Sequence, residues 1–292
     1  MKLSSRNKVN GGKMTRALDE FHPEETLVID GDILFHKASY LSSDVIDWED
    51  GTEPELIQHE EQALQMIYEL VNTITTEVLY RRDDDVNCVI FAVSCPSGKY
   101  FRHGLYPDYK SNRKNTTLPY KSLLDTLKET MHNIGNKNRI RYISELLGIP
   151  VFVMFVRHLE ADDIMGIYGS YGSVIATIDK DLKQVPCHCY NWYKRTFEKP
   201  SEDEADFFFY KQILKGDPTD GFGGCKGIGE KRADKILRPY FGNPVGLWSA
   251  VVQTFLDKDH STNDAIRNAR MAFILRSQEN LDGQVVLWNP PE

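Results

Sequence analysis

Short apolar runs alternate along the chain with longer segments that have the periodicity of amphipathic helices. Val and Ile dominate four of these runs, which are residues 26–32 (TLVIDGD), 86–94 (VNCVIFAVS), 150–155 (PVFVMF) and 173–179 (SVIATID). Helical periodicity marks residues 53–80 and 121–147 between them. This order of short strands and intervening helices predicts an α/β domain built on a mostly parallel sheet.

The overall composition is that of a folded globular protein. The chain has 292 residues, of which 41% are hydrophobic and 27% are charged, enough for one large domain or two modest ones. The longest apolar run, residues 149–156, is too short to span a membrane. Residues 1–22 are polar and lack the apolar segment of a secretion signal, so we expect a loose N-terminal lead and a cytoplasmic protein.

Cysteine usage points to reduced thiols rather than to a disulfide framework, because the five cysteines are odd in number and scattered. Cys187, His188 and Cys189 are the densest group. A zinc site usually needs four ligands at wider spacing, so a partly buried strand end is the better interpretation of these three residues.

Carboxylates gather at the predicted ends of the strands and in one later glycine-rich segment. The eight acids are Asp30, Glu160, Asp162, Asp163, Asp179, Asp181, Asp217 and Asp220. Taken singly, each is explained as a helix cap or turn residue. Ligands of an open parallel sheet bind at the carboxyl ends of its strands, where eight such charges would repel one another unless divalent cations neutralised them. Oxygen-rich, histidine-poor ligation favours Mg²⁺ or Mn²⁺ over Zn²⁺.

Basic residues are concentrated in two segments, although the net charge of −8 taken alone disfavours a nucleic-acid partner. Residues 99–114 contain five Lys or Arg, and so do residues 226–238. In residues 223–235 (GGCKGIGEKRADK), glycines permit a tight turn that presents amide N–H groups to a phosphate at a helix N-terminus. This segment predicts a grip on the DNA backbone that is independent of base identity. The alternative is an ordinary glycine cap between two helices.

Five motifs resemble, in the same order, those of the phage and bacterial 5′ nuclease family, which includes flap endonucleases, 5′→3′ exonucleases and the 5′ nuclease domain of DNA polymerase I. They are VIDGD, YPDYKSNRK, LEADDIMG, TIDKDLKQ and KGDPTDGFGGCKGIGEKRADKIL, and they extend over about residues 27–240. The resemblance implies a PIN-like α/β core (residues 23–200) and a C-terminal helix-hairpin-helix subdomain with an extension (201–292). A helical arch within about residues 108–141 would cover the site.

The resemblance also implies an activity and its partners. The expected reaction is hydrolysis of DNA from 5′ ends or at 5′ flaps with two Mg²⁺ or Mn²⁺ ions, in phage replication or recombination in the host cytoplasm. An RNA–DNA hybrid substrate and a replication protein as partner are left open, and we expect a monomer that does not bind membranes.

By position, the resemblance assigns roles to individual residues. Asp30, Glu160, Asp162 and Asp163 would hold one metal region, and Asp179, Asp181, Asp217 and Asp220 the second. Lys110 and Arg113 match the basic pair at the base of the arch, residues 115–140, and would stabilise charge on the reacting phosphate. The expected DNA contacts are Lys37, Tyr109, Lys114, Gly227, Gly229, Lys231, Arg232 and Lys235. Tyr106 and Tyr120 are further candidates for base stacking, with a half-buried core role as the alternative for such tyrosines.

The chain departs from the family pattern at one strand end. Relatives commonly carry a further Asp after the second strand, where this chain has Ser94, Cys95 and Pro96. Either water or a hydroxyl fills that position, or one metal binds less tightly. Two other functional classes stay open: a non-catalytic DNA-binding protein, which would need no acids, and a PIN-type RNA nuclease, which would need no hairpin for duplex DNA.

Overall fold

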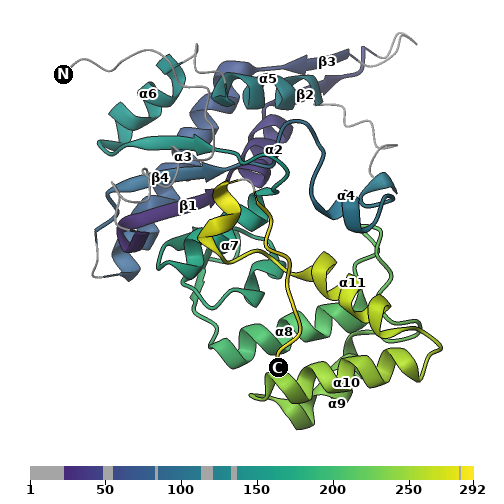
Figure 1. The fold of residues 1–292 in the computed structure, drawn as a ribbon. Helices are drawn as coiled ribbons and strands as arrows, with labels where there is room; N and C mark the ends of the chain where they lie inside the picture. The colour runs from purple at the N-terminus through teal and green to yellow at the C-terminus, as the bar shows by residue number, and fades with distance from the viewer. Residues whose placement is uncertain (1–22, 49–54, 83–84, 113–120, 133–136, 283) are drawn as a thin grey trace.

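A six-stranded sheet forms the centre of the protein (Figure 1). The computed structural model describes residues 23–48, 55–82, 85–112, 121–132, 137–282 and 284–292. The strand order is β5-β4-β1-β6-β7-β8, and all neighbours are parallel except β7 and β8. The strands are β1 (Thr26–Asp30), β4 (Cys88–Ala92), β5 (Val151–Met154), β6 (Val174–Ala176), β7 (Cys189–Asn191) and β8 (Thr196–Glu198). The predicted α/β fold with a mostly parallel sheet is therefore confirmed.

Helices cover both faces of the sheet, and the central strand β1 shows how the chain achieves this. Leu27 and Ile29 are fully buried against one layer, and Val28 is buried against the other. The first layer contains α2 (Gly31–Leu41), α3 (Glu60–Arg81), α5 (Lys121–His132) and α6 (Lys137–Leu147). Helix α7 (Ala161–Ser170) forms the second layer. Burial on both faces explains why the strands appear in the sequence as continuous apolar runs.

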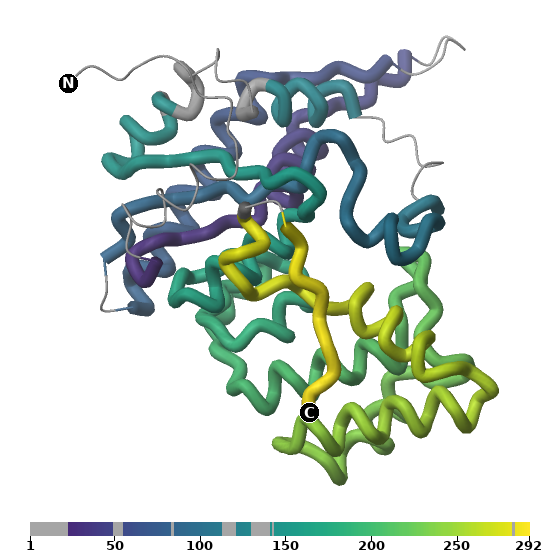
Figure 2. Tube along the Cα trace, viewed as in Figure 1, coloured from purple at the N-terminus to yellow at the C-terminus, as the bar shows by residue number. Residues whose placement is uncertain are grey.

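A helical region with its own apolar core follows the sheet (Figure 1). Its helices are α8 (Glu202–Lys215), α9 (Glu230–Leu237), α10 (Pro244–Leu256) and α11 (Thr262–Ala272). Figure 2 shows the yellow C-terminal segment leaving α11, reaching the sheet region beside α7 and returning to the helices. Ile274 and Leu275 pack beside α7, whereas Trp288 packs against Trp248 with ring centroids 5.1 Å apart. The C-terminal segment therefore joins the two regions.

Short elements complete the described part of the chain. These are the helix α4 (Arg102–Leu105) and the 3-10 helices η2 (Pro23–Glu25), η5 (Lys180–Gln184), η6 (Arg238–Tyr240) and η7 (Gln278–Asp282). All five cysteines are free, and His188 stacks on Phe197 beside the start of β7, which agrees with a strand end. Within the described residues, every helix is too short or too polar to cross a membrane.

The structure differs from the sequence prediction at residues 53–80. Helix α3 begins at Glu60, and the preceding residues form β3 (Glu55–Gln58), which pairs antiparallel with β2 (Ser43–Ile46). Periodicity within one segment cannot reveal a partner strand, and here the partner satisfies the backbone groups of β3. The predicted arch contains α5 and the first residues of α6, which continues to Leu147, but residues 113–120 and 133–136 of that prediction lie outside the described residues.

Two glycines close the turn that carries Asp217 and Asp220. Gly216 and Gly224 have φ angles of 68° and 59°, in the left-handed region. A Cβ atom on Gly216 would lie 2.3 Å from the backbone N of Gly224. The turn therefore requires glycine for both its conformation and its packing.

We predict that Gly216→Ala lowers the free energy of unfolding by about 2 kcal/mol or more, because it adds both backbone strain and a steric clash. Gly223→Ala is the matched control, since a Cβ there meets no atom within 4 Å, and it should change stability by less than about 0.5 kcal/mol. Urea unfolding of both variants measures the difference. Equal stability of the two variants would contradict this account of the turn.

Candidate active site

One large cavity lies at the carboxyl ends of the central strands. Its volume is about 1260 Å³, and it extends from the strand ends to α5 on one side and to the turn before α9 on the other. All the predicted metal-binding acids line it except Asp163, and Asp32 lines it as well. The fold thus brings together acids that lie up to 190 positions apart, from Asp30 to Asp220.

Hydrogen bonds fix the acids at the ends of β1 and β6. Asp30 is buried, and its carboxylate caps α2 by accepting from Ile33 N at 3.0 Å and accepts from Thr177 Oγ1 at 2.8 Å. Thr177 Oγ1 also accepts from Asp179 N at 3.0 Å. Asp179 Oδ1 in turn accepts from Asp181 N at 2.8 Å. These contacts place three carboxylates on adjacent strand ends.

Burial and like charge disfavour ionisation of several of these acids. Burial, with the nearby charge of Asp32, raises the pKa of Asp30 to about 7. Burial and then the charge of Asp179 raise the pKa of Asp181 to about 6, and Asp181 Oδ1 is a buried atom without a hydrogen-bond partner among the described residues. The pKa of Asp162 is raised by burial, then by Asp179 and Asp30. A cation would favour the ionised form of all three.

This set of donors fits a hard divalent cation. Oxygen ligands of this kind suit Mg²⁺ or Mn²⁺, and Asp181 supplies an orphaned buried oxygen. The acids line one cavity, although among the described residues no group of three or more His, Cys, Asp or Glu side chains is already gathered tightly enough to hold a metal ion.

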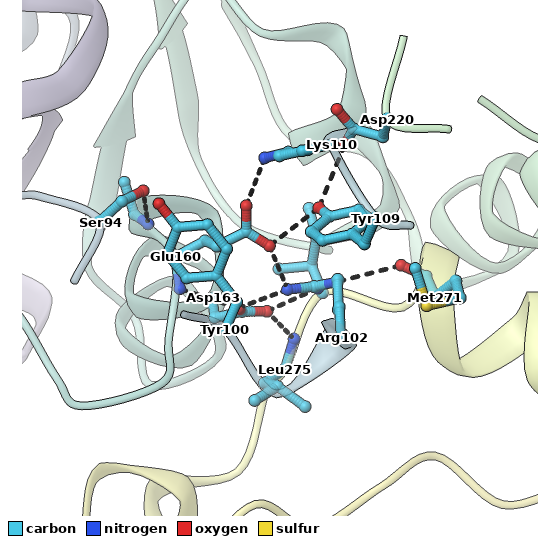
Figure 3. A network of polar contacts seen from close by, with 12 residues as sticks. Ser94, Tyr100, Arg102, Tyr109, Lys110, Glu160, Asp163, Asp220, Met271 and Leu275 are labelled. Carbon is cyan, nitrogen blue, oxygen red and sulfur yellow. Dashed lines mark hydrogen bonds and ion pairs between the residues drawn. The ribbon is translucent and has the colours of Figure 1, made fainter. Parts of the chain in front are cut away.

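Arg102 organises the acids that follow β5 (Figure 3). This side chain is 4% exposed, and its guanidinium donates to both oxygens of Asp163 at 2.7 and 2.8 Å and to Glu160 at 2.8 Å. It also donates to the carbonyls of Met271 and Phe273 at 3.0 and 2.8 Å. All its donors therefore have acceptors, which a fork of planar N–H groups makes possible.

The same contacts occupy both oxygens of Asp163, whose predicted role as a metal ligand stays a prediction. Its side chain is fully buried, does not line the cavity, and also accepts from Leu275 N at 3.3 Å and Glu160 N at 3.2 Å. Asp162 faces the cavity instead. Successive residues on a helix point about 100° apart, so one wall of the cavity takes only one of the pair. In this structure Asp163 therefore pairs with Arg102, whereas Asp162 lines the cavity.

Lys110 lies among the acids on the other side of Glu160 (Figure 3). Its Nζ contacts Glu160 and lies 3.8 Å from Asp220 Oδ2. Although burial opposes the effect, the charges of Arg102 and Lys110 hold the pKa of Glu160 below its usual value. Lys110 has a φ of 55° and donates its backbone N–H to Asp220 O, so a strained conformation holds this lysine at the cavity.

Tyr109 is buried rather than exposed to solvent, and its predicted contact with DNA stays a prediction. The side chain is 3% exposed, and its hydroxyl donates towards Glu160 and Asp220 at 2.9 and 3.2 Å. Lys37 packs over the ring of Trp192 at 4.7 Å and does not line the cavity. Arg113 and Lys114 lie outside the described residues.

The predicted hairpin residues lie in the turn between α8 and α9 and on α9 itself. Gly227 has a φ of 77°, and Gly229 is the N-cap of α9 and lines the cavity. Lys231, Arg232 and Lys235 are exposed on α9, and Arg232 donates to Gly227 O at 2.9 Å. Of the predicted hairpin residues, Gly229 therefore borders the same cavity as the acids, and the role of each residue stays a prediction.

Several residues that line the cavity or organise it could not be identified from the sequence. Arg102 lies in the basic segment 99–114, but its burial could not be seen there. Asp32 stands in the quoted VIDGD motif, two residues after Asp30. Lys128 of α5 and Lys215 at the end of α8 also line the cavity. Their amphipathic helices gave no signal of which lysines face the acids.

An α/β sheet with an acid-lined cavity at its strand ends and a helical hairpin at the rim has the architecture of a nuclease. The family of 5′-3′ exonucleases with an N-terminal resolvase-like domain matches residues 25–208, so the chain belongs to that family. It is 25% identical over 302 residues to the exonuclease of Escherichia phage T7, covering 90% of this chain and 93% of the relative. It is 27% identical over 197 residues to the thermostable DNA polymerase I of Thermus thermophilus, covering 61% of this chain and 21% of the polymerase.

Solved structures show the same fold. The 5′-exonuclease of T5 with bound divalent metal ions (zinc) has a TM-score of 0.56 at 19% identity, covering 85% of this chain and 88% of that chain. A T5 flap endonuclease in complex with DNA and metal ions has a TM-score of 0.52 at 17% identity, covering 88% and 96%. The resemblance seen in the sequence motifs is confirmed.

We predict that Arg102→Met lowers the free energy of unfolding by about 3 kcal/mol or more, because it leaves buried Asp163 without its counter-charge and removes one of the two cations that contact Glu160. Arg102→Lys should fall between this variant and the unmodified protein, since it keeps the charge but loses the fork. Arg141→Met, at an exposed pair with Glu145, should change stability by less than about 1 kcal/mol. Chemical unfolding ranks the variants, and a mild effect of Arg102→Met would refute the central role of this arginine.

Proposed function

We propose that the chain uses two Mg²⁺ or Mn²⁺ ions to hydrolyse DNA phosphodiester bonds at 5′ ends and at 5′ flap junctions. By family the chain is a 5′-3′ exonuclease. The observation that carries the proposal is the single cavity that joins the crowded carboxylates to Gly229, the N-cap of the hairpin helix α9. Acids that are costly to ionise together, placed beside a phosphate-binding segment, suit a metal-assisted attack on a phosphodiester.

The acids divide into two groups that would hold the ions. Asp30, Glu160 and Asp162 come from the ends of β1 and β5, and Asp179, Asp181, Asp217 and Asp220 come from the end of β6 and the turn after α8. Bound divalent ions supply charge stabilisation and an activated water for in-line displacement. The hydrogen bonds from Thr177 to Asp30 and from Tyr109 to Glu160 orient these carboxylates.

Lys110 would act on the phosphate itself. Its ammonium group is at the cavity, its backbone is fixed by Asp220 O, and its present partners are acids of the site. In a complex with DNA, the positive charge of Lys110 would stabilise the negative charge that builds up on the phosphoryl oxygens in the transition state. Arg113, the second basic residue of the motif, is proposed to share that role.

The hairpin favours DNA with a duplex part over single-stranded RNA. Exposed Lys231 and Lys235 follow the N-terminus of α9, and contacts of this type position a duplex without reading its bases. Single-stranded RNA and an RNA–DNA hybrid serve as further substrates in the same cleavage assay. Duplex binding without cleavage would instead favour a non-catalytic DNA-binding protein. A monomeric state and a replication-protein partner stay predictions.

Replacing Asp181 by Asn should lower the cleavage rate of a 5′-labelled flap by at least about a hundredfold, because it removes charge from the site while keeping the shape. Asp257→Asn, at the exposed end of α10, is the control and should cleave normally. Rates with Mg²⁺ and with EDTA are compared, together with duplex affinity, which should change little. Near-normal cleavage by pure Asp181→Asn protein would remove this carboxylate from the proposed site.

Loss of Lys231 and Lys235 should weaken DNA binding without slowing the cleavage step. The Lys231→Ala/Lys235→Ala variant should bind flap DNA more weakly and lose about one unit of salt-dependence slope per phosphate contact. Its single-turnover rate at saturating enzyme should stay near the unmodified rate, whereas Lys110→Ala should slow that step. Lys194→Ala/Lys199→Ala removes the same charge elsewhere and should keep the salt slope. A hairpin variant with an unchanged slope would show that α9 does not contact phosphates.

A further inference from the structure

Asp32 lies where helix α2 meets the end of strand β4. Its Oδ2 accepts from the backbone N–H of Ser94 at 3.1 Å. Its Oδ1 is buried and lies 2.9 Å from Nζ of Lys128 on α5. The carboxylate lines the same cavity as Asp30 and Glu160. Asp32, a residue of α2, therefore places its carboxylate at the end of β4.

The position of this carboxylate matters because the end of β4 has no acid of its own. Ser94, Cys95 and Pro96 follow the strand, and the side chain of Ser94 is occupied in accepting from Ala161 N at 3.0 Å. Strand β4 pairs with both β1 and β5, so its end lies between the acids that follow those two strands. A charge at that point adjoins both groups of carboxylates on this side of the cavity.

We propose that Asp32 supplies, from α2, the metal-binding carboxylate that the end of β4 lacks. The inference rests on the proposed function, because it assigns a further residue to the same metal centre. Asp32 directs one oxygen to the strand end, which fixes its orientation, and keeps a second oxygen paired with a lysine. A divalent cation would compete with this ammonium group for the carboxylate of Asp32.

A purely structural role for Asp32 makes a different prediction. Asp32 and Lys128 link α2 to α5, and the pair could serve only to hold α5 over the cavity. In that case removal of either partner would have the same effect. If Asp32 binds the ion, the two removals change the metal affinity in opposite directions. Loss of Asp32 weakens metal binding, whereas loss of Lys128 takes a competing positive charge away from the carboxylate.

The test measures the dissociation constant of Mn²⁺ for the DNA-free protein by electron paramagnetic resonance of the free ion. Asp32→Asn keeps an oxygen that accepts from Ser94 N but removes the charge, and it should raise the dissociation constant at least about tenfold. Lys128→Met should leave the constant unchanged or lower it. Asp125→Asn on α5, whose acid pairs with exposed Lys121, is the control and should have no effect.

A rescue variant moves the carboxylate back to the strand. Asp32→Asn/Ser94→Asp should recover most of the lost Mn²⁺ affinity, and a double variant as weak as Asp32→Asn would overturn the assignment. Unmodified affinity in Asp32→Asn, or equal losses in Asp32→Asn and Lys128→Met, would also overturn it. Asp181→Asn distinguishes failure of the Asp32 assignment from failure of the proposed metal centre. If it alone loses affinity, Asp32 is excluded and the proposed metal centre stands, and if it also binds normally, both fail.

Discussion

The buried guanidinium of Arg102 is the contact on which the rest of the molecule depends. It neutralises Glu160 and Asp163 after β5, and it binds the carbonyls of Met271 and Phe273 at the end of the helical region. An ion pair at this depth stabilises a fold only when its remaining hydrogen bonds are satisfied, and here they are. One side chain thus sets the direction of Glu160 towards the cavity and fixes the chain that returns from α11.

The acids in the cavity illustrate a conflict between folding and activity. Asp30 is held in place by Ile33 and Thr177, yet its burial beside other carboxylates raises its pKa to about 7. Such crowding disfavours the metal-free fold at neutral pH, because each ionised acid destabilises its neighbours. Functional sites often retain this kind of cost, since the same crowding gives affinity for the ligand.

Much of the fold and site could be predicted from the sequence because strands buried on both faces give continuous apolar runs. Asp30, Asp179 and Asp181 follow those runs directly, so their shared edge was foreseeable. The pairing of β2 with β3 was not, because periodicity within residues 53–80 does not show the partner strand that precedes them. The sequence does not distinguish adjacent acids such as Asp162 and Asp163. Only their directions on helix α7 determine which of the two faces the cavity. Likewise, burial of Tyr109 and Arg102 depends on α11 and the turn at Asp220, which lie over a hundred residues away.

The return of the C-terminal segment to the sheet has a consequence for biosynthesis. Gln184 donates to Ala272 O and accepts from Ile274 N, and Leu275 N donates to Asp163. A ribosome makes these partners after every acid of the cavity, so a nascent chain that already contains all of those acids still lacks the contacts that fix two of its walls. The site is completed only when residues 272–275 have also emerged. Partial products of translation would then carry the motifs of the enzyme without its finished cavity.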